Sequence, residues 1–102
     1  MSVITKKSVK AGVRFSIHAK EKMRNRGVRV SDVLAAITAP DSLYEDVEYG
    51  TLVAVRRIND NIVIVVYKME NGEAKVITLF YTTKLDKLIR AKMVRGVWKK
   101  QE

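Results

Sequence analysis

The spacing of apolar residues changes midway along the chain, from a helical period to the composition of β-strands. In the first part, Ala19 and Met23 lie four apart within residues 17–26, and Val33 and Ile37 repeat that spacing. Residues four apart fall on one face of a helix, so each pair supplies a buried side. Further along, segments rich in Val, Ile, Thr and Tyr alternate with short polar breaks. The pattern predicts two helices followed by a sheet.

Residues that favour helix ends mark the limits of both predicted helices. Ser16 is a good N-cap for the first helix, and Gly27 suits the left-handed position just past its end. We expect Ser31 and Asp32 to cap the second helix. Pro40 ends it, because a proline pushes the preceding residue out of the helical region. The short connection between the two predicts a helical hairpin.

The sheet is expected to be a four-stranded antiparallel meander, because the breaks between its strands are short and rich in turn residues. The apolar run Ile62–Val66 has no polar face, which is typical of a central strand. The first strand carries charges and is expected at an edge. The four predicted strands are Leu43–Tyr49, Thr51–Ile58, Ile62–Met69 and Ala74–Tyr81.

A last, basic helix is expected after Thr82 or Thr83, which would cap it. Trp98 either anchors the end of the chain on the core or remains an exposed contact residue. The apolar face of this helix is formed by Leu85, Leu88, Ile89, Met93 and Val97.

The predicted fold class is therefore α+β: two N-terminal helices, a four-stranded antiparallel meander and a C-terminal basic helix, with the helices on one sheet face. The length of 102 residues indicates one domain. Within it, residues 1–14 would form an arm or a short strand, residues 15–82 the core, and residues 83–102 the last helix.

Cysteine is absent, which excludes disulfides and thiolate metal sites, and a single histidine makes zinc binding improbable. No cofactor or metal is expected. The sequence begins with no secretory signal pattern, and its longest apolar run is far shorter than the ~20 residues of a membrane span. We expect a cytoplasmic location and no association with a membrane.

The net charge of +9 is concentrated in two terminal segments. Nine of the 20 Lys and Arg residues lie between Lys6 and Arg29, and seven more lie between Lys84 and Lys100. Two basic segments around a mildly acidic centre favour a surface that binds a polyanion, RNA or another nucleic acid. The same charge could serve solubility alone. A small acidic, antitoxin-like protein would also fit this surface.

His18 is the only histidine and lies in the first turn of the first predicted helix. The positive end of a helix favours a neutral imidazole, which can act as a general base. A histidine at such a position more often bonds a neighbouring backbone group. Lys22 and Arg26 follow on the same helix face, and repeated cations without an acid favour an anion there. The candidate nucleic-acid-binding residues are Lys20, Lys22, Arg24, Arg56, Lys84, Lys87 and Arg90.

Tyr44, Tyr67 and Tyr81 could stack on bases, although tyrosines in sheets more often pack against neighbouring strands. The two predicted helices within residues 16–39 do not suit a helix-turn-helix motif. The first of them is the more basic, whereas the recognition helix of that motif is the second. No glycine-rich phosphate loop or nucleophile elbow is present.

Several motifs together resemble a prokaryotic family of small domains of unknown function. They are F-S-I-H-A-K-E-K-M-R-N-R-G-V from residue 15, the S-D-V-L-A-A-I and A-P-D segments, and V-I-T-L-F-Y on the last strand. The resemblance covers about residues 15–82 and implies a fold similar to RelE-like, barnase-like and colicin-like toxin ribonucleases. It points to His18, Arg26 and Thr78 as site residues. Met23 departs from the polar or basic residue of many relatives, and Arg24 would replace it.

Two functions follow as expectations. The first is a toxin-like, metal-independent endoribonuclease or an RNA-binding relative, in which the catalytic candidates are His18, Arg26, Tyr81 and Thr78. His18 would be the base, Arg26 would stabilise phosphate charge, and Tyr81 or a lysine would be the acid. The second is a non-enzymatic nucleic-acid-binding module, or an interaction protein neutralised by an acidic partner.

Overall fold

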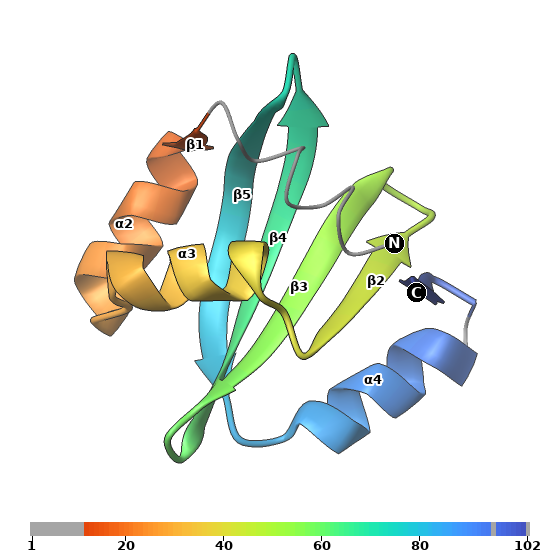
Figure 1. Cartoon of the computed structure of the whole chain (residues 1–102). Coiled ribbons are helices and arrows are strands. Elements are labelled where there is room, and N and C mark those ends of the chain that lie inside the picture. The colour runs from red at the N-terminus through yellow and green to blue at the C-terminus, as the bar shows by residue number, and fades with distance from the viewer. Residues whose placement is uncertain (1–11, 95, 102) are drawn as a thin grey trace.

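The computed structural model describes residues 12–94 and 96–101. One mixed sheet of six strands forms its middle, α2 and α3 cover one face, and α4 lies against the other (Figure 1). The elements in chain order are β1 (Val13–Phe15), α2 (Ile17–Arg26), α3 (Val30–Thr38), β2 (Ser42–Asp46), β3 (Thr51–Ile58), β4 (Asn61–Glu70), β5 (Glu73–Thr82), α4 (Leu85–Val94) and β6 (Trp98–Gln101).

The strand order is β1-β5-β4-β3-β2-β6, so the predicted four-stranded sheet is wrong. Strands β2 to β5 pair antiparallel in chain order, and β4 lies inside the sheet. The sheet gains β1, which runs parallel to β5, and β6, which pairs with β2. A three-residue strand is too short to show alternation, and β6 directly follows a helical period, so neither leaves a clear sequence signal.

Alternate residues of the central strands face different helices, and the prediction of helices on one face is therefore wrong. Val63 and Val65 belong to the core beneath α2 and α3. Ile62 and Ile64 belong to a second core, together with Trp98 and the apolar residues of α4. In Figure 1, α3 crosses the sheet over β3 and β4. A strand that is apolar on both faces requires cover on both, and α4 supplies the second cover.

The ends of α2 are those that the sequence predicts, whereas the start of α3 is not. The Ser16 hydroxyl accepts the Ala19 N–H at 3.0 Å, and Gly27 ends α2 in the left-handed region at φ 66°. Helix α3 begins one residue before Ser31, with Arg29 at the N-cap and no side-chain cap. The capping role predicted for Ser31 and Asp32 is wrong, because the Asp32 carboxylate accepts the Tyr81 hydroxyl instead.

Strand β2 ends at Asp46, three residues earlier than predicted. The Asp46 carboxylate accepts the N–H groups of Glu48 at 3.0 Å and Tyr49 at 3.2 Å, which turns the chain before β3. The other side of β2 pairs with β6, with Trp98 opposite Asp46. The expected charged edge strand is therefore an interior strand of the sheet.

Helix α4 is shorter than its apolar period suggests. The Thr82 hydroxyl accepts the N–H of Lys84 rather than an amide inside the helix, so Thr82 forms a turn before it. After Val94 the chain turns, with the Val97 N–H donating to the Lys92 carbonyl at 3.0 Å. Most of the predicted arm, residues 1–11, lies outside the described residues, and β1 is the part that the structure describes.

Candidate functional site

Helix α2 is fixed beside β5, the strand that carries the V-I-T segment. The Ser16 N–H donates to the Val76 carbonyl at 2.9 Å, and the Ser16 hydroxyl donates to the Ile77 carbonyl at 2.9 Å. Ala19 is fully buried, and Met23 packs against the same core. Strand β1 pairs with residues 74–76 of β5. Where that pairing ends, Ser16 at the N-cap of α2 donates to the Val76 and Ile77 carbonyl groups of β5.

Lys22 links α2 to the opposite face of the sheet. Its Nζ lies 5.4 Å from the centre of the Phe80 ring, a distance at which a cation is attracted to an aromatic face. Phe80 packs against the core that α4 covers. Ala19, which lies on α2 like Lys22, packs against the core on the other face of the sheet. The Lys22 ammonium therefore reaches around the edge of β5 from one face to the other.

His18 and Arg26 lie one helical turn to either side of Lys22, on the same face of α2. Both side chains are exposed. The two residues are eight positions apart, which places them about 12 Å apart along the helix axis. The imidazole of His18 has no hydrogen-bond partner among the described residues. The helix therefore spreads these groups along a line and does not gather them at one point.

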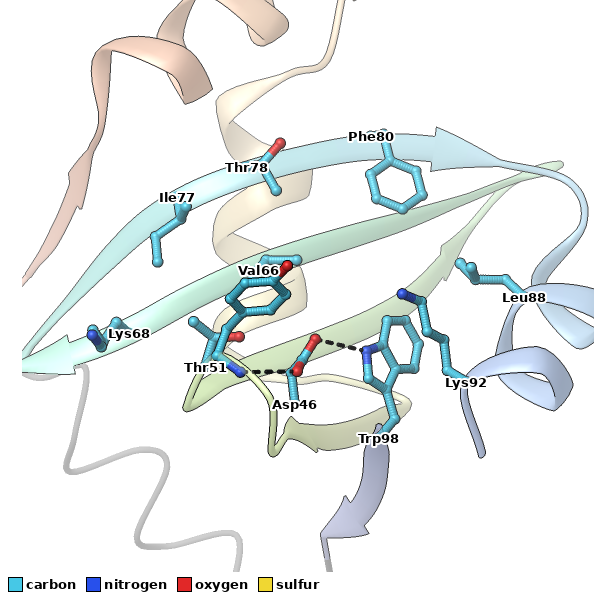
Figure 2. A pocket seen from close by; sticks show the side chains of 11 residues that line it. Asp46, Thr51, Val66, Lys68, Ile77, Thr78, Phe80, Leu88, Lys92 and Trp98 are labelled. Carbon is cyan, nitrogen blue, oxygen red and sulfur yellow. Dashed lines mark hydrogen bonds between the residues drawn. The ribbon is translucent and has the colours of Figure 1, made fainter. Parts of the chain in front are cut away.

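A cavity of about 620 Å³ lies between α4, β6 and the sheet face that carries Phe80 (Figure 2). Its walls are mainly apolar, with lysines at its borders. Figure 2 shows Lys68 and Lys92 at opposite ends, with Lys92 reaching from α4 toward the sheet. The lining residues are Asp46, Tyr49, Thr51, Val66, Lys68, Ile77, Thr78, Phe80, Leu88, Lys92 and Trp98.

A β-bulge in β5 brings two consecutive side chains to this cavity. Val66 is paired with Thr78 and Tyr67 with Val76, so Ile77 is an extra residue between the two pairs. Both Ile77 and Thr78 line the cavity, although neighbouring residues of a regular strand would face opposite ways. The bulge thus places the threonine of the V-I-T segment at the cavity.

The end of the cavity near β6 is held by a buried carboxylate. Asp46 is only 7% exposed, and its Oδ2 accepts the Trp98 indole N–H at 3.2 Å. The Glu48 and Tyr49 amides occupy its other oxygen, Oδ1. Three donors satisfy this charge within the protein, which is the usual condition for burying one. Asp46 thereby orders the cavity wall.

Thr51 contributes a polar atom without a partner. Its side chain is 6% exposed, lines the cavity, and makes no hydrogen bond among the described residues. The Tyr67 hydroxyl is also unpartnered, but it lies in the core beneath α2 and α3, and burial raises its pKa to about 12. Of these two residues, only Thr51 lines the cavity.

Tyr81 lies on the opposite sheet face from Thr78. Its hydroxyl donates to Asp32 Oδ2 at 2.6 Å and accepts the Arg29 N–H at 3.5 Å. Burial and the bond to the Asp32 carboxylate raise the pKa of Tyr81. The structure therefore ties Tyr81 to α3 and separates it from Thr78 and the cavity.

The remaining basic candidates are distributed over three elements. Arg56 is half-buried, and its guanidinium donates to the Ala39 carbonyl at 2.5 Å, which closes the end of α3. The other side chains are exposed: Lys20 and Arg24 on α2, with Lys84, Lys87 and Arg90 at α4. Among the sequence-derived candidates, the Lys22 side chain reaches the sheet face that carries the cavity, and Thr78 lies on that face and lines the cavity.

Of the eleven described residues that line the cavity, sequence reasoning names only Thr78 as a site residue, and it misses Tyr49, Thr51, Lys68, Phe80, Lys92 and Trp98 among others. Tyr49 is 70% exposed, a value unusual for an aromatic side chain and invisible in the sequence. The available signal was weak. An aspartate followed within four residues by a glycine favours a turn, and that turn places Tyr49 and Thr51.

One family model, described as a domain of unknown function (DUF4258), matches residues 15–81. The chain belongs to the DUF4258 family. Neither a curated protein nor a solved structure matches the chain significantly. The DUF4258 segment includes α2 and the strands β2 to β5, apart from the last residue of β5, while α4 and β6 follow it. The cavity is therefore built jointly by the DUF4258 segment and by the residues after it.

Among the residues that the structure describes, no group of three or more His, Asp or Glu side chains is arranged to hold a metal ion. Within residues 12–94 and 96–101, no helix has both the length and the apolar character that a membrane crossing requires.

Proposed function

We propose that this DUF4258 protein binds single-stranded RNA across the sheet face that carries Phe80. The observation that carries the proposal is the Lys22 ammonium, 5.4 Å from the Phe80 ring centre at the edge of this face. Single-strand binders combine cations that follow the phosphates with aromatic rings on which bases stack. Lys22 and Phe80 bring the two together at one point.

Cations lie on both sides of this face. Lys22 reaches this face from α2, whereas Lys87 and Arg90 are exposed on α4 and Lys92 lines the cavity. Tyr49, which is largely exposed at the cavity, offers a second ring for stacking. An RNA strand that crosses this face from α2 to α4 would pass cations at both ends and aromatic rings between them.

The binding test uses fluorescence anisotropy of a labelled single-stranded RNA 12-mer at stepped salt concentrations. Lys22→Gln is expected to weaken binding roughly five-fold and to lower the slope of log K against log salt by about one. Arg29→Gln is the matched control, since it removes one exposed cation at the start of α3. Its affinity should stay within two-fold. Equal losses for the two variants, or no binding at 50 mM salt, would refute the proposal.

RNA cleavage is a second candidate, favoured by the exposed His18 on the same helix face as Lys22. The resemblance to RelE-like toxin ribonucleases points the same way. His18 would take the proton of a 2′-OH that attacks the adjacent phosphate, and Lys22 would stabilise the developing charge. The bond from phosphorus to the 5′-oxygen of the next nucleotide would break, and that oxygen would take a proton from a lysine or from water. Tyr81 does not suit the acid role, because its hydroxyl donates to Asp32 and its raised pKa opposes proton release.

Cleavage is tested with the same RNA in the presence of a chelator. The wild type should give products that end in a 2′,3′-cyclic phosphate, and an oligomer with 2′-deoxyribose throughout should remain intact. His18→Ala should abolish cleavage while binding stays within about two-fold. Unchanged cleavage by His18→Ala, or none by the wild type, would reject catalysis and leave the binding proposal standing.

A further inference from the structure

We propose that the cavity between α4, β6 and the sheet is a nucleotide pocket that admits one base and the phosphate attached to it. The inference deepens the proposed function and, for a base at the end of an RNA strand, rests on it. A free 5′-mononucleotide presents the same chemistry. The pocket would thus supply base recognition, which the cations of α2 and α4 do not provide.

The size and walls of the cavity suit a planar ring. Its volume of about 620 Å³ falls within the ~300–1,000 Å³ of typical small-molecule sites. Val66, Ile77 and Phe80 form the sheet side, and Leu88 contributes from α4. The Trp98 indole N–H is already bonded to Asp46, so its remaining surface at the cavity is apolar. A base could bury its faces against these walls.

The Thr51 hydroxyl indicates that the ligand has a polar edge. A buried hydroxyl without a partner is unfavourable, and a hydrogen bond from a ligand would remove that cost. Thr51 lines the cavity, is nine-tenths buried, and has no partner among the described residues. A hydroxyl donates or accepts, and base edges carry both kinds of group. An apolar ring would leave it unsatisfied.

The charges around the cavity suit a phosphate. Lys68 and Lys92 stand at its opposite ends, so an anionic group at either end meets a cation (Figure 2). Among the described residues of the lining, Asp46 is the one carboxylate, and three protein N–H groups already bond to it. A mainly apolar interior with a cation at each end and the unpartnered Thr51 hydroxyl in its wall matches a base that carries a phosphate.

The experiment uses the full chain and follows Trp98 fluorescence, since the chain has one tryptophan. The probes are AMP, a 5′-phosphorylated RNA 8-mer, and the same 8-mer with an abasic 5′ residue. A saturable change with AMP, or with the 8-mer but not its abasic form, supports the pocket and distinguishes free from strand-borne nucleotide. RNA binding by anisotropy without any Trp98 change overturns the pocket and leaves the proposed function intact. AMP binding without RNA binding would support the pocket and overturn the proposed function.

Two variants locate the ligand. Thr51→Val keeps the side-chain shape, removes the hydroxyl, and should weaken AMP or 8-mer binding about ten-fold. Lys92→Gln should weaken it about five-fold and tests the pocket independently of Thr51. Thr38→Val, at the exposed end of α3, is the control and should have no effect. Near-ultraviolet circular dichroism verifies that each variant is folded. Wild-type affinity in both Thr51→Val and Lys92→Gln would overturn the assignment.

Discussion

The indole N–H of Trp98 donates a hydrogen bond of 3.2 Å to the carboxylate of Asp46, a residue 52 positions earlier in the chain. This bond joins β6 to the end of β2 and forms one wall of the cavity. The ring of Tyr44 lies beside the indole, with 5.5 Å between centroids and 34° between planes. The buried hydrogen bond between Asp46 and Trp98 therefore holds the edge strand β6 in place and fixes one wall of the candidate site.

Replacement of Asp46 by alanine should destabilise the protein by about 2–4 kcal/mol. The substitution leaves the Glu48 and Tyr49 amides and the Trp98 indole without their acceptor. Urea unfolding followed by far-ultraviolet circular dichroism measures the change. Glu48→Ala, which alters an exposed side chain in the same turn, should stay within about 0.5 kcal/mol. Similar losses in the two variants would contradict the structural role assigned to Asp46.

Trp98→Phe tests the same hydrogen bond from the other side. Phenylalanine keeps most of the buried ring but loses the N–H donor, so we expect a loss of about 1–3 kcal/mol. The double variant with Asp46→Ala should be less destabilised than the sum of the two single variants, because the bond can be lost only once. Additive losses in urea unfolding would show that the two residues do not act together.

The buried Tyr67 hydroxyl predicts a loss of stability in alkali. Its pKa rises from 10.0 in the unfolded chain to about 12 in the fold, because burial disfavours the phenolate. A group with a raised pKa stabilises the fold fully below the unfolded value and loses that contribution as pH approaches the folded value. The loss should reach about 1.4 kcal/mol by pH 11.

Tyr67→Phe isolates this contribution. The variant removes an unpartnered buried hydroxyl, so it should be at least as stable as the wild type at pH 8. Its free energy of unfolding should fall about 1.4 kcal/mol less than that of the wild type between pH 8 and pH 11. Parallel pH profiles for the two proteins would place the Tyr67 hydroxyl in contact with water.

Gly27→Ala should destabilise the fold by about 1 kcal/mol. Gly27 has φ 66°, and a side chain in that region is strained even though the space around it is open. Asn25→Ala, at an exposed position inside α2, serves as the control and should be neutral or slightly stabilising. Thermal unfolding compares the two. A Gly27→Ala protein as stable as the control would indicate that α2 does not end in this conformation.

The sequence predicts well those elements whose signals are local. Ser16 and Gly27 mark α2 because a cap and a left-handed residue act within a few positions. The run Ile62–Val66 indicates a central strand because it is apolar on both faces. It does not indicate that a helix covers each face. The cover on the second face depends on where α4 packs after the chain leaves β5, and tertiary contacts determine that position.

The candidate site divides in the same way. The sequence locates His18 and Lys22 on one helix face, since their spacing is local. It does not bring Thr51 and Lys92 together, because β4 and β5 lie between them in the chain and the packing of α4 on the sheet determines their separation. Asp46 resembles an exposed acid of an edge strand until β6 covers it. Its burial depends on Trp98, 52 residues away.

The pairing of β1 with β5 and of β2 with β6 carries a kinetic consequence. The β3-β4 and β4-β5 hairpins close through two-residue turns, whereas Val13 meets Ala74 and Asp46 meets Trp98 only across long loops. Closure of a long loop costs more entropy than closure of a short one, so distant pairs form more slowly. We therefore expect the hairpins to assemble early and β6 to dock late. The cavity would be completed in the last step of folding, and a partly folded chain would lack it.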